Sequence, residues 1–205
     1  CYDAGMALFT GKGDTGTTKL FDTGRASKDG ARHDSAESGK RVMKSAPIFE
    51  CLGQLDELNT IVGWTKTATP GDFAFDGRSG KELLEDVQDH LFTIQAEVAG
   101  AQKSIPQSSV ETLSSIINSI EKELPEIKTF LVPGGTEFSA RLDIARAVSR
   151  RVERRLVTLH ESGERAVSDP SRAYANRLSS LFYALGRLAN HRAGVNEVKP
   201  NYLAD

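Results

Sequence analysis

The segment from Ser139 to Ser162, SARLDIARAVSRRVERRLVTLHES, separates apolar from charged residues with the period of an α-helix. An apolar residue recurs every three or four positions, starting just before the segment: Phe138, Leu142, Ala145, Val148, Val152, Leu156 and Leu159. Because about 3.6 residues make one helical turn, these side chains share one side of a helix. The segment therefore predicts an amphipathic helix whose apolar side is buried against other elements.

The same period recurs in four other parts of the chain. They are residues 47–66, 81–100, the stretch between Pro106 and Pro125, and 178–189. Strand-like alternation is almost absent beyond residues 1–20. Five amphipathic helices with short connections predict an all-α fold, an up-and-down five-helix bundle, preceded by a glycine-rich loop.

The composition excludes several classes of protein. With 205 residues, of which 39% are apolar and 26% charged, the chain is long enough for one well-buried core and one domain. A net charge of -2 argues against a surface built throughout for nucleic acid. The sequence has no apolar run long enough to cross a bilayer, so neither nucleic acid nor membrane is predicted as a partner.

The cysteines and histidines predict neither a disulfide framework nor a structural metal. Cys1 and Cys51 are too few for such a framework, which favours a reducing compartment. Because the chain starts with Cys1 rather than methionine, we expect an upstream segment, with any targeting signal, to be missing. No metal-ligand spacing connects the four histidines, His33, His90, His160 and His191.

The glycine-rich stretch LFTGKGDTGTTKLF, residues 8–21, holds Gly11, Gly13 and Gly16 in the spacing G-x-G-x-x-G. A dinucleotide-binding fold is disfavoured because no buried strand precedes the glycines and no helix follows them. A P-loop is excluded because two threonines follow Gly16, where lysine and then serine or threonine are required.

Two interpretations of this stretch remain open. Its N–H groups could cradle an anion, with Lys12 adding charge and a threonine at position 10, 17 or 18 adding a hydroxyl. Alternatively it is a plain turn, which is the commoner outcome for such a motif taken alone. The polar, Gly- and Ser-rich segment 22–43 that follows predicts a mobile linker.

A second side of the 139–162 helix carries charge at helical spacing: Asp143, Arg146, Arg150, Glu153 and Arg154. One interpretation is a solvated face held together by internal ion pairs. Against it, the helix holds six arginines within about four turns, which repel one another unless anions or carboxylates lie opposite. A polyphosphate ligand would meet that need.

A complementary group is predicted on the 47–66 helix. Asp56 and Asn59 lie three residues apart on one face, while Leu55, Leu58 and Val62 turn to the core. Asp56 could pair with one of the arginines if the two helices meet, within a chain or across a subunit boundary. An exposed acidic pair is an equally good interpretation of these residues alone.

Five short motifs occur along the chain. They are T-x-x-G-D-x-G-x-T (Thr10 to Thr18), G-x-x-D-E-L-N (Gly53 to Asn59), F-x-x-P-G-G (Phe130 to Gly135), A-R-x-x-x-R-R-x-E-R (Ala145 to Arg154) and N-R-L-S (Asn176 to Ser179). In kind and order they resemble the motifs of PduO-type ATP:cob(I)alamin adenosyltransferases. The set is specific although no single motif is, and it covers nearly the whole chain.

The resemblance implies a ferritin-like five-helix bundle that assembles as a homotrimer with active sites at subunit interfaces. It implies that residues 1–45 form a nucleotide-binding loop and mobile linker and residues 46–205 the bundle, within one domain. In the implied reaction the cobalt of cob(I)alamin attacks the 5′ carbon of Mg-ATP, which gives adenosylcobalamin and triphosphate. The implied partners are a reductase and an acceptor enzyme, in the cytoplasm or the mitochondrial matrix.

The resemblance also implies roles for particular residues. Arg150 would pair with Asp56 across the interface, and Phe130 would lie beneath the corrin, which makes cobalt(II) easier to reduce. Glu153, Arg154 and Asn176 would contact the nucleotide. The implied nucleotide-binding set is Thr10, Gly11, Lys12, Gly13, Asp14, Gly16, Thr18, Lys44, Asn59, Arg146, Glu153, Arg154 and Asn176.

The chain departs from the family pattern at several positions. Gly11 stands where the family has a basic residue, Ile48 where it has an arginine, Asp143 where it has a histidine and Ser180 where it has an aspartate. The linker 22–43 is longer than usual and is a plausible lid. The departures at Ile48 and Asp143 favour an alternative function, a carrier or sensor that binds ATP or a corrinoid without turnover.

Overall fold

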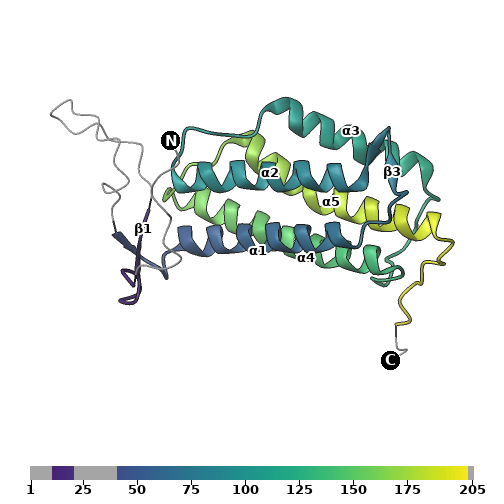
Figure 1. The fold of residues 1–205 in the computed structure, drawn as a ribbon, viewed down its shortest axis with the longest axis horizontal. Helices are drawn as coiled ribbons and strands as arrows, with labels where there is room; N and C mark the ends of the chain where they lie inside the picture. Colours follow the sequence, from purple (N-terminus) through teal and green to yellow (C-terminus); the bar gives the residue numbers. More distant parts are fainter. Residues whose placement is uncertain (1–10, 21–40, 203–205) are drawn as a thin grey trace.

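The computed structural model describes residues 11–20 and 41–202 (Figure 1). Its five helices are α1 (Pro47–Thr67), α2 (Gly80–Ala99), α3 (Gln107–Glu123), α4 (Glu137–Glu161) and α5 (Asp169–Arg192). Two short antiparallel ribbons complete the described part, β1 (Thr17–Lys19) with β2 (Arg41–Met43) and β3 (Ala74–Phe75) with β4 (Arg78–Ser79). The predicted all-α fold of five helices is confirmed.

Capping side chains mark the starts of α2, α4 and α5. At α2 the Ser79 hydroxyl accepts the Glu82 N–H at 3.2 Å, and the Glu82 carboxylate accepts the Ser79 N–H at 2.9 Å, a reciprocal capping box. At α5 the Ser168 hydroxyl caps the first turn, so the helix begins at Asp169. The apolar pattern marked only residues 178–189 of α5, because a polar cap and not an apolar residue fixes its start.

Successive helices run in alternating directions. Arg151 pairs with Glu57, whereas Arg155, further along α4, pairs with Glu50, earlier in α1, so the two helices are antiparallel. Side-chain contacts make α1 and α2 antiparallel, α4 and α5 antiparallel, and α3 and α5 parallel. This is the order of an up-and-down bundle, as predicted.

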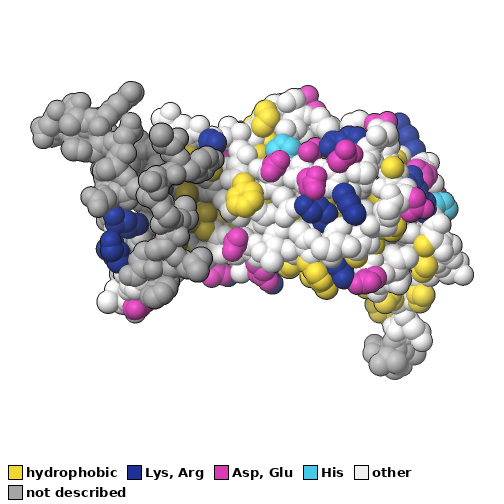
Figure 2. Space-filling view, viewed as in Figure 1, with side chains coloured by type: hydrophobic (Ala, Val, Ile, Leu, Met, Phe, Trp, Pro, Cys, Tyr) yellow, Lys and Arg dark blue, Asp and Glu magenta, His cyan; other side chains and the backbone are white. Residues whose placement is uncertain are grey.

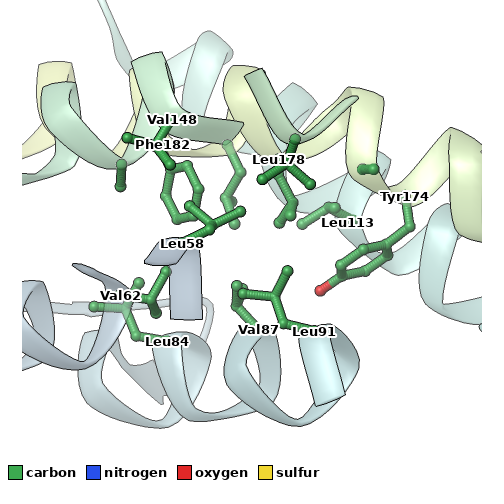
Figure 3. Packing of buried hydrophobic residues seen from close by; sticks show 14 of the residues in the cluster. Leu58, Val62, Leu84, Val87, Leu91, Leu113, Val148, Tyr174, Leu178 and Phe182 are labelled. Atoms are coloured by element: carbon green, nitrogen blue, oxygen red, sulfur yellow. The ribbon is translucent and has the colours of Figure 1, made fainter. Parts of the chain in front are cut away.

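The core lies between α1, α2, α4 and α5, with α3 packed on the outside of α5 (Figure 3). Leu58 and Val62 of α1 face Leu84 of α2, and Phe182 of α5 fills the space between the layers; all four side chains are fully buried. Full burial of such a side chain stabilises the fold by about 1.5–3 kcal/mol. The apolar faces that the helical period predicted are therefore buried together in one continuous core.

Strands β2, β3 and β4 lie beyond residues 1–20, where the sequence analysis expected almost no strand. The β3–β4 hairpin turns at Asp76 and Gly77, which have φ of 51° and 74°, the backbone of a type I′ turn. Asp-Gly is the usual sequence for such a turn, so this signal was present and was missed.

The β1–β2 ribbon corrects the prediction that residues 22–43 are mobile throughout. Thr17 pairs with Met43, so Arg41–Met43 form a strand through partners distant in sequence. Residues 21–40 lie outside the described part. The ribbon leads directly into α1, at the left end of the bundle in Figure 1. Among the described helices, none is long and apolar enough to span a membrane.

Candidate functional site

The glycine-rich loop is a pair of consecutive tight turns. The Asp14 N–H donates to the Gly11 carbonyl at 3.2 Å, and the Gly16 N–H donates to the Gly13 carbonyl at 3.1 Å. Gly11 and Gly16 have φ of 67° and 79°, which an L side chain rarely adopts. The stretch is therefore a turn, as one of the two interpretations predicted, and its role in binding an anion stays a prediction. Thr10 lies outside the described residues.

Two basic residues beyond the linker, Lys44 and Arg41, contact this loop. The Lys44 backbone N–H donates to the Gly16 carbonyl at 2.9 Å, and a Cβ on Gly13 would lie 3.1 Å from the Lys44 ammonium. The ammonium predicted to meet a phosphate therefore stands directly beside the glycines. Figure 2 shows basic side chains gathered at this end of the molecule.

Arg41 is a loop residue that the sequence analysis missed. Its guanidinium donates to the Thr17 carbonyl at 3.0 Å and to the Thr17 hydroxyl at 2.8 Å, and it also reaches the Lys12 carbonyl. It therefore braces the turn from β2. In the sequence Arg41 is only a basic residue near the end of a polar linker. Its contact with the loop could not be predicted, because it depends on the pairing of β2 with β1.

The arginines of α4 divide into two groups. Those that face α1 are neutralised there: Arg151 bonds to Glu57 at 2.6 Å and Arg155 to Glu50 at 3.4 Å. Arg141 stacks on the Trp64 ring at 4.3 Å and donates to its carbonyl. These three side chains therefore have partners on α1, and none of them belongs to the charged stripe that begins at Asp143.

The second group of α4 arginines, Arg150 and Arg154, has no such partners among the described residues. Arg150 and Arg154 are exposed, and within residues 11–20 and 41–202 neither guanidinium has a hydrogen bond or an ion pair. Beside them the Asn176 amide of α5 donates to the Glu153 carboxylate at 2.5 Å. Glu153 and Asn176, predicted to contact one nucleotide, are thus brought together, and two uncompensated positive charges flank them.

Asp56 and Asn59 do not share an accessible face as their spacing predicted. Asp56 is exposed, whereas Asn59 is only 5% exposed and lies with the core residues of α1. A step of three residues is about 300°, enough to move Asn59 to the edge of the buried face. Gln88 of α2 donates to the Asn59 backbone carbonyl at 3.2 Å. Asp56 and Arg150 do not touch within the described part of one chain, so their pairing across subunits stays a prediction.

Phe130 lies in the connection between α3 and α4, and 79% of its surface is exposed. It precedes the Pro133–Gly135 turn, which roofs an open cavity of about 270 Å³ between α4, α5 and residues 195–198. Arg146 and Tyr183 line this cavity, and burial raises the pKa of the Tyr183 hydroxyl. An exposed aromatic ring beside a cavity is the arrangement a large flat ligand requires.

The structure shows where two of the departures from the family pattern lie, Ile48 and Asp143. Ile48 is a core residue, 2% exposed, so its side chain faces away from the charged stripe. Asp143 lines the cavity, where its carboxylate accepts the Gly134 N–H at 2.9 Å and the Arg146 guanidinium at 3.4 Å. Both residues therefore have a role in packing or loop geometry.

Comparison with known proteins agrees with these features. Residues 31–189 match the family model described as cobalamin adenosyltransferase. The chain is 34% identical to the corrinoid adenosyltransferase PduO of Citrobacter freundii, over 94% of this chain and 52% of that protein. It thus spans about half the length of that relative. It is also 33% identical to a corrinoid adenosyltransferase of Bacillus subtilis, over 95% of this chain and 92% of that one.

Solved structures give the same result. A variant of the PduO-type ATP:corrinoid adenosyltransferase of Lactobacillus reuteri, complexed with ATP, superimposes with a TM-score of 0.78 at 26% identity, covering 95% of this chain and 100% of that one. A second variant, complexed with cobalamin and ATP, gives a TM-score of 0.77 at 25% identity, with coverage of 94% and 96%. With its bundle, its loop and its motifs in family order, this chain belongs to the cobalamin adenosyltransferase family.

Proposed function

We propose that this chain transfers the 5′-deoxyadenosyl group of ATP to the cobalt of cob(I)alamin and releases triphosphate. The observation that carries this proposal is the uncompensated pair Arg150 and Arg154, next to the bonded Glu153 and Asn176. Two exposed guanidinium groups one turn apart repel each other, and the single Glu153 carboxylate beside them can offset only one of their two charges, so an additional anion would be favourable there. A triphosphate supplies that anion, and the family's reaction produces one.

The chemistry assigns the arginines a definite task. A cobalt(I) electron pair attacks the 5′ carbon, the bond from that carbon to the α-phosphate oxygen breaks, and its electron pair leaves with the triphosphate. Negative charge therefore grows on the leaving group in the transition state. Cations already fixed at that place stabilise the charge without reorganisation. Arg150 and Arg154 on α4, with Lys44 and Lys12 at the loop, are the cations that we assign to this task.

Magnesium fits the loop as a companion of the nucleotide. The oxygen donors of the loop, the carboxylate of Asp14 and the neighbouring threonine hydroxyls, belong to the class that Mg²⁺ prefers. No cluster of three metal-ligating side chains occurs in the described ranges. When bound with ATP, Mg²⁺ neutralises part of the phosphate charge, while Asp14 would complete its oxygen shell.

The corrinoid belongs, in this proposal, beside Phe130. That aromatic side chain is exposed and directly precedes Leu131, which lines the cavity; it would cover the lower face of the corrin and there exclude water and the dimethylbenzimidazole from the cobalt. A cobalt without a lower ligand is easier to reduce. Phe130 thus acts on the redox step and the arginines on the leaving group.

We propose a homotrimer with sites between subunits, and the places of these parts in one chain support sites shared between subunits. The glycine loop precedes the start of α1, and Phe130 precedes the start of α4, which is antiparallel to α1, so they lie at opposite ends of the bundle. The 25 residues of α4 make it about 37 Å long. A loop from a neighbouring subunit would bring ATP within reach of Phe130. We further propose that residues 1–45 and 46–205 act as nucleotide loop and bundle, with 22–43 as a lid, of which residues 22–40 lie outside the described part.

The cellular setting is also part of the proposal. The buried free thiol of Cys51 is compatible with a reducing compartment, the cytoplasm or the mitochondrial matrix. There a reductase would supply cobalt(I), and an enzyme that uses adenosylcobalamin would take the product.

The test is an anaerobic assay with Mg-ATP and chemically reduced cob(I)alamin, following loss of the cobalt(I) absorbance and formation of a light-sensitive cobalt–carbon bond. We expect Arg150→Ala and Arg154→Ala to lower kcat by about 100- to 1,000-fold, the usual loss for one charge-stabilising donor. The matched control is Arg151→Ala, an adjacent arginine already neutralised by Glu57, which should change kcat little. Phe130→Ala should slow the reaction that starts from cobalt(II) more than the one that starts from cobalt(I).

Two results would contradict the proposal. A folded wild-type protein that binds ATP or cobalamin without turnover would instead be the carrier or sensor. Equal losses in Arg150→Ala and Arg151→Ala would show that the uncompensated charge is not what matters.

A further inference from the structure

The loop that carries Phe130 is held at Val132, whose N–H donates to the Val198 carbonyl at 2.8 Å, and from two helices at Gly134. The Gly134 carbonyl accepts the Asn190 amide of α5 at 2.8 Å, and the Gly134 N–H donates to the Asp143 carboxylate of α4 at 2.9 Å. Asn190 is 5% exposed and also accepts the Thr136 N–H at 3.0 Å. Phe130 therefore projects from a base whose position depends on α4 and α5 together.

The second oxygen of the same carboxylate faces the charged stripe. Asp143 Oδ1 accepts from Arg146 Nε at 3.4 Å, and the Arg146 guanidinium lies 6.0 Å from the centre of the Tyr183 ring. Both partners are shielded, with side-chain exposures of 18% for Asp143 and 30% for Arg146. Only the Nε edge of Arg146 is engaged within the described ranges, which leaves its two terminal nitrogens for an anion.

We infer that Asp143 is a positioning residue that couples the nucleotide half of the site to the corrinoid half. One oxygen fixes Gly134 and hence the base of the Phe130 loop, and the other fixes Arg146, the first arginine of the row that continues with Arg150 and Arg154. This inference rests on the proposed function, since it assigns the two ends of Asp143 to the two substrates of that reaction.

The physical basis of the coupling is a shared carboxylate. A phosphate bound to the terminal nitrogens of Arg146 immobilises the guanidinium and with it the carboxylate on its Nε edge. The Gly134 N–H then donates to an acceptor that no longer moves, so the Phe130 loop is already ordered when the corrinoid binds. The corrinoid therefore pays less of the entropy cost of ordering that loop. Because coupling between two sites is reciprocal, cobalamin must tighten ATP binding by the same factor.

The test measures binding and not turnover. ATP affinity is determined by calorimetry with and without cob(II)alamin, and cob(II)alamin affinity by absorbance with and without ATP; no reductant is present, so no transfer occurs. The first variant is Asp143→Ala, which removes both bonds. The second is Asp143→Asn, which keeps an oxygen to accept the Gly134 N–H but lacks the negative charge that pairs with Arg146. The control is Asp86→Asn, which alters the ion pair between Asp86 of α2 and Arg78 of β4, neither of which lines the cavity.

In the wild type and in Asp86→Asn we expect each ligand to tighten the other by about fivefold or more. That factor should fall close to one in Asp143→Ala. In Asp143→Asn the factor should also fall, while the affinity for cob(II)alamin alone stays near the wild-type value, a separation that a general loss of stability would not produce. A coupling factor in Asp143→Ala equal to that of the wild type, or no coupling in the wild type, would overturn the inference alone. A wild-type protein that binds neither ligand would overturn the proposed function as well.

Discussion

Replacing Gly135 by alanine is the sharpest structural test of the loop beneath Phe130. Gly135 has φ of 117°, and an added Cβ would lie 2.3 Å from Asn190 Oδ1 and 2.7 Å from its Cγ and Nδ2. Contacts this short do not occur, so either the loop or the Asn190 side chain must move. Gly134 provides a matched control, because its φ is 119° but nothing lies within 4 Å of an added Cβ.

The expected cost can be worked from these contacts. Placing an L side chain at such a φ costs about 1–2 kcal/mol, and this applies to both variants. Gly135→Ala also displaces Asn190, which makes two hydrogen bonds worth about 1 kcal/mol each. We therefore expect Gly135→Ala to lower the free energy of unfolding by about 3–4 kcal/mol and Gly134→Ala by about 1–2 kcal/mol.

The measurement is urea unfolding at one fixed protein concentration, because an oligomer gains stability with concentration. Hydrogen exchange at the Thr136 amide, which bonds to Asn190, reports a local shift even where the bundle stays intact. Adding Asn190→Ala to Gly135→Ala removes the clashing side chain, so the two changes should cost less together than the sum of the single changes. The reasoning is refuted if Gly135→Ala destabilises no more than Gly134→Ala and leaves the Thr136 amide protected.

Two further predictions concern subunit contacts and a buried thiol. If the proposed trimer contains an Asp56–Arg150 pair between subunits, Asp56→Arg should weaken the assembly in analytical ultracentrifugation, and adding Arg150→Asp should restore it; a double variant that dissociates as far as the single one would exclude this pair. Burial raises the pKa of Cys51 from its ordinary value near 9.0 to about 12, so its alkylation at pH 8 should be about a thousandfold slower in the folded protein than in urea, measured on the Cys51 peptide by mass spectrometry. Because the folded state holds the proton more tightly, the associated stability is present below pH 9 and is lost as the pH rises towards 12; rapid alkylation of the native protein would contradict this.

The helices were predictable because their signal is local. Each apolar stripe repeats within one segment, and the stripe of α4 that begins at Phe138 is buried as its period predicts. The end of α5 was predicted better than its start, since the start depends on the Ser168 cap. The β3–β4 hairpin was missed although its Asp-Gly turn is also a local signal.

The candidate site was predictable as a set of residues and not as an arrangement. The sequence marked Glu153 and Asn176 by motif, and the structure joins them by a hydrogen bond between α4 and α5. Asn59, by contrast, was assigned to an accessible face and is buried, because a residue at the border of two helical faces is placed by the neighbour that covers it. Arg41 had no role until β2 paired with β1.

What the sequence alone determined is therefore the number, type and order of the helices and the family, because a helical period and a motif each lie within a short segment. Only the tertiary structure decided which arginines of α4 are free, since that depends on carboxylates such as Glu50 and Glu57, about a hundred residues away on α1. It also decided that Asp143 serves two partners at once, Gly134 and Arg146. Carboxylates of α1 neutralise some arginines of α4 and leave others without a partner. Which arginines remain unpaired is therefore decided only when the two helices pack together.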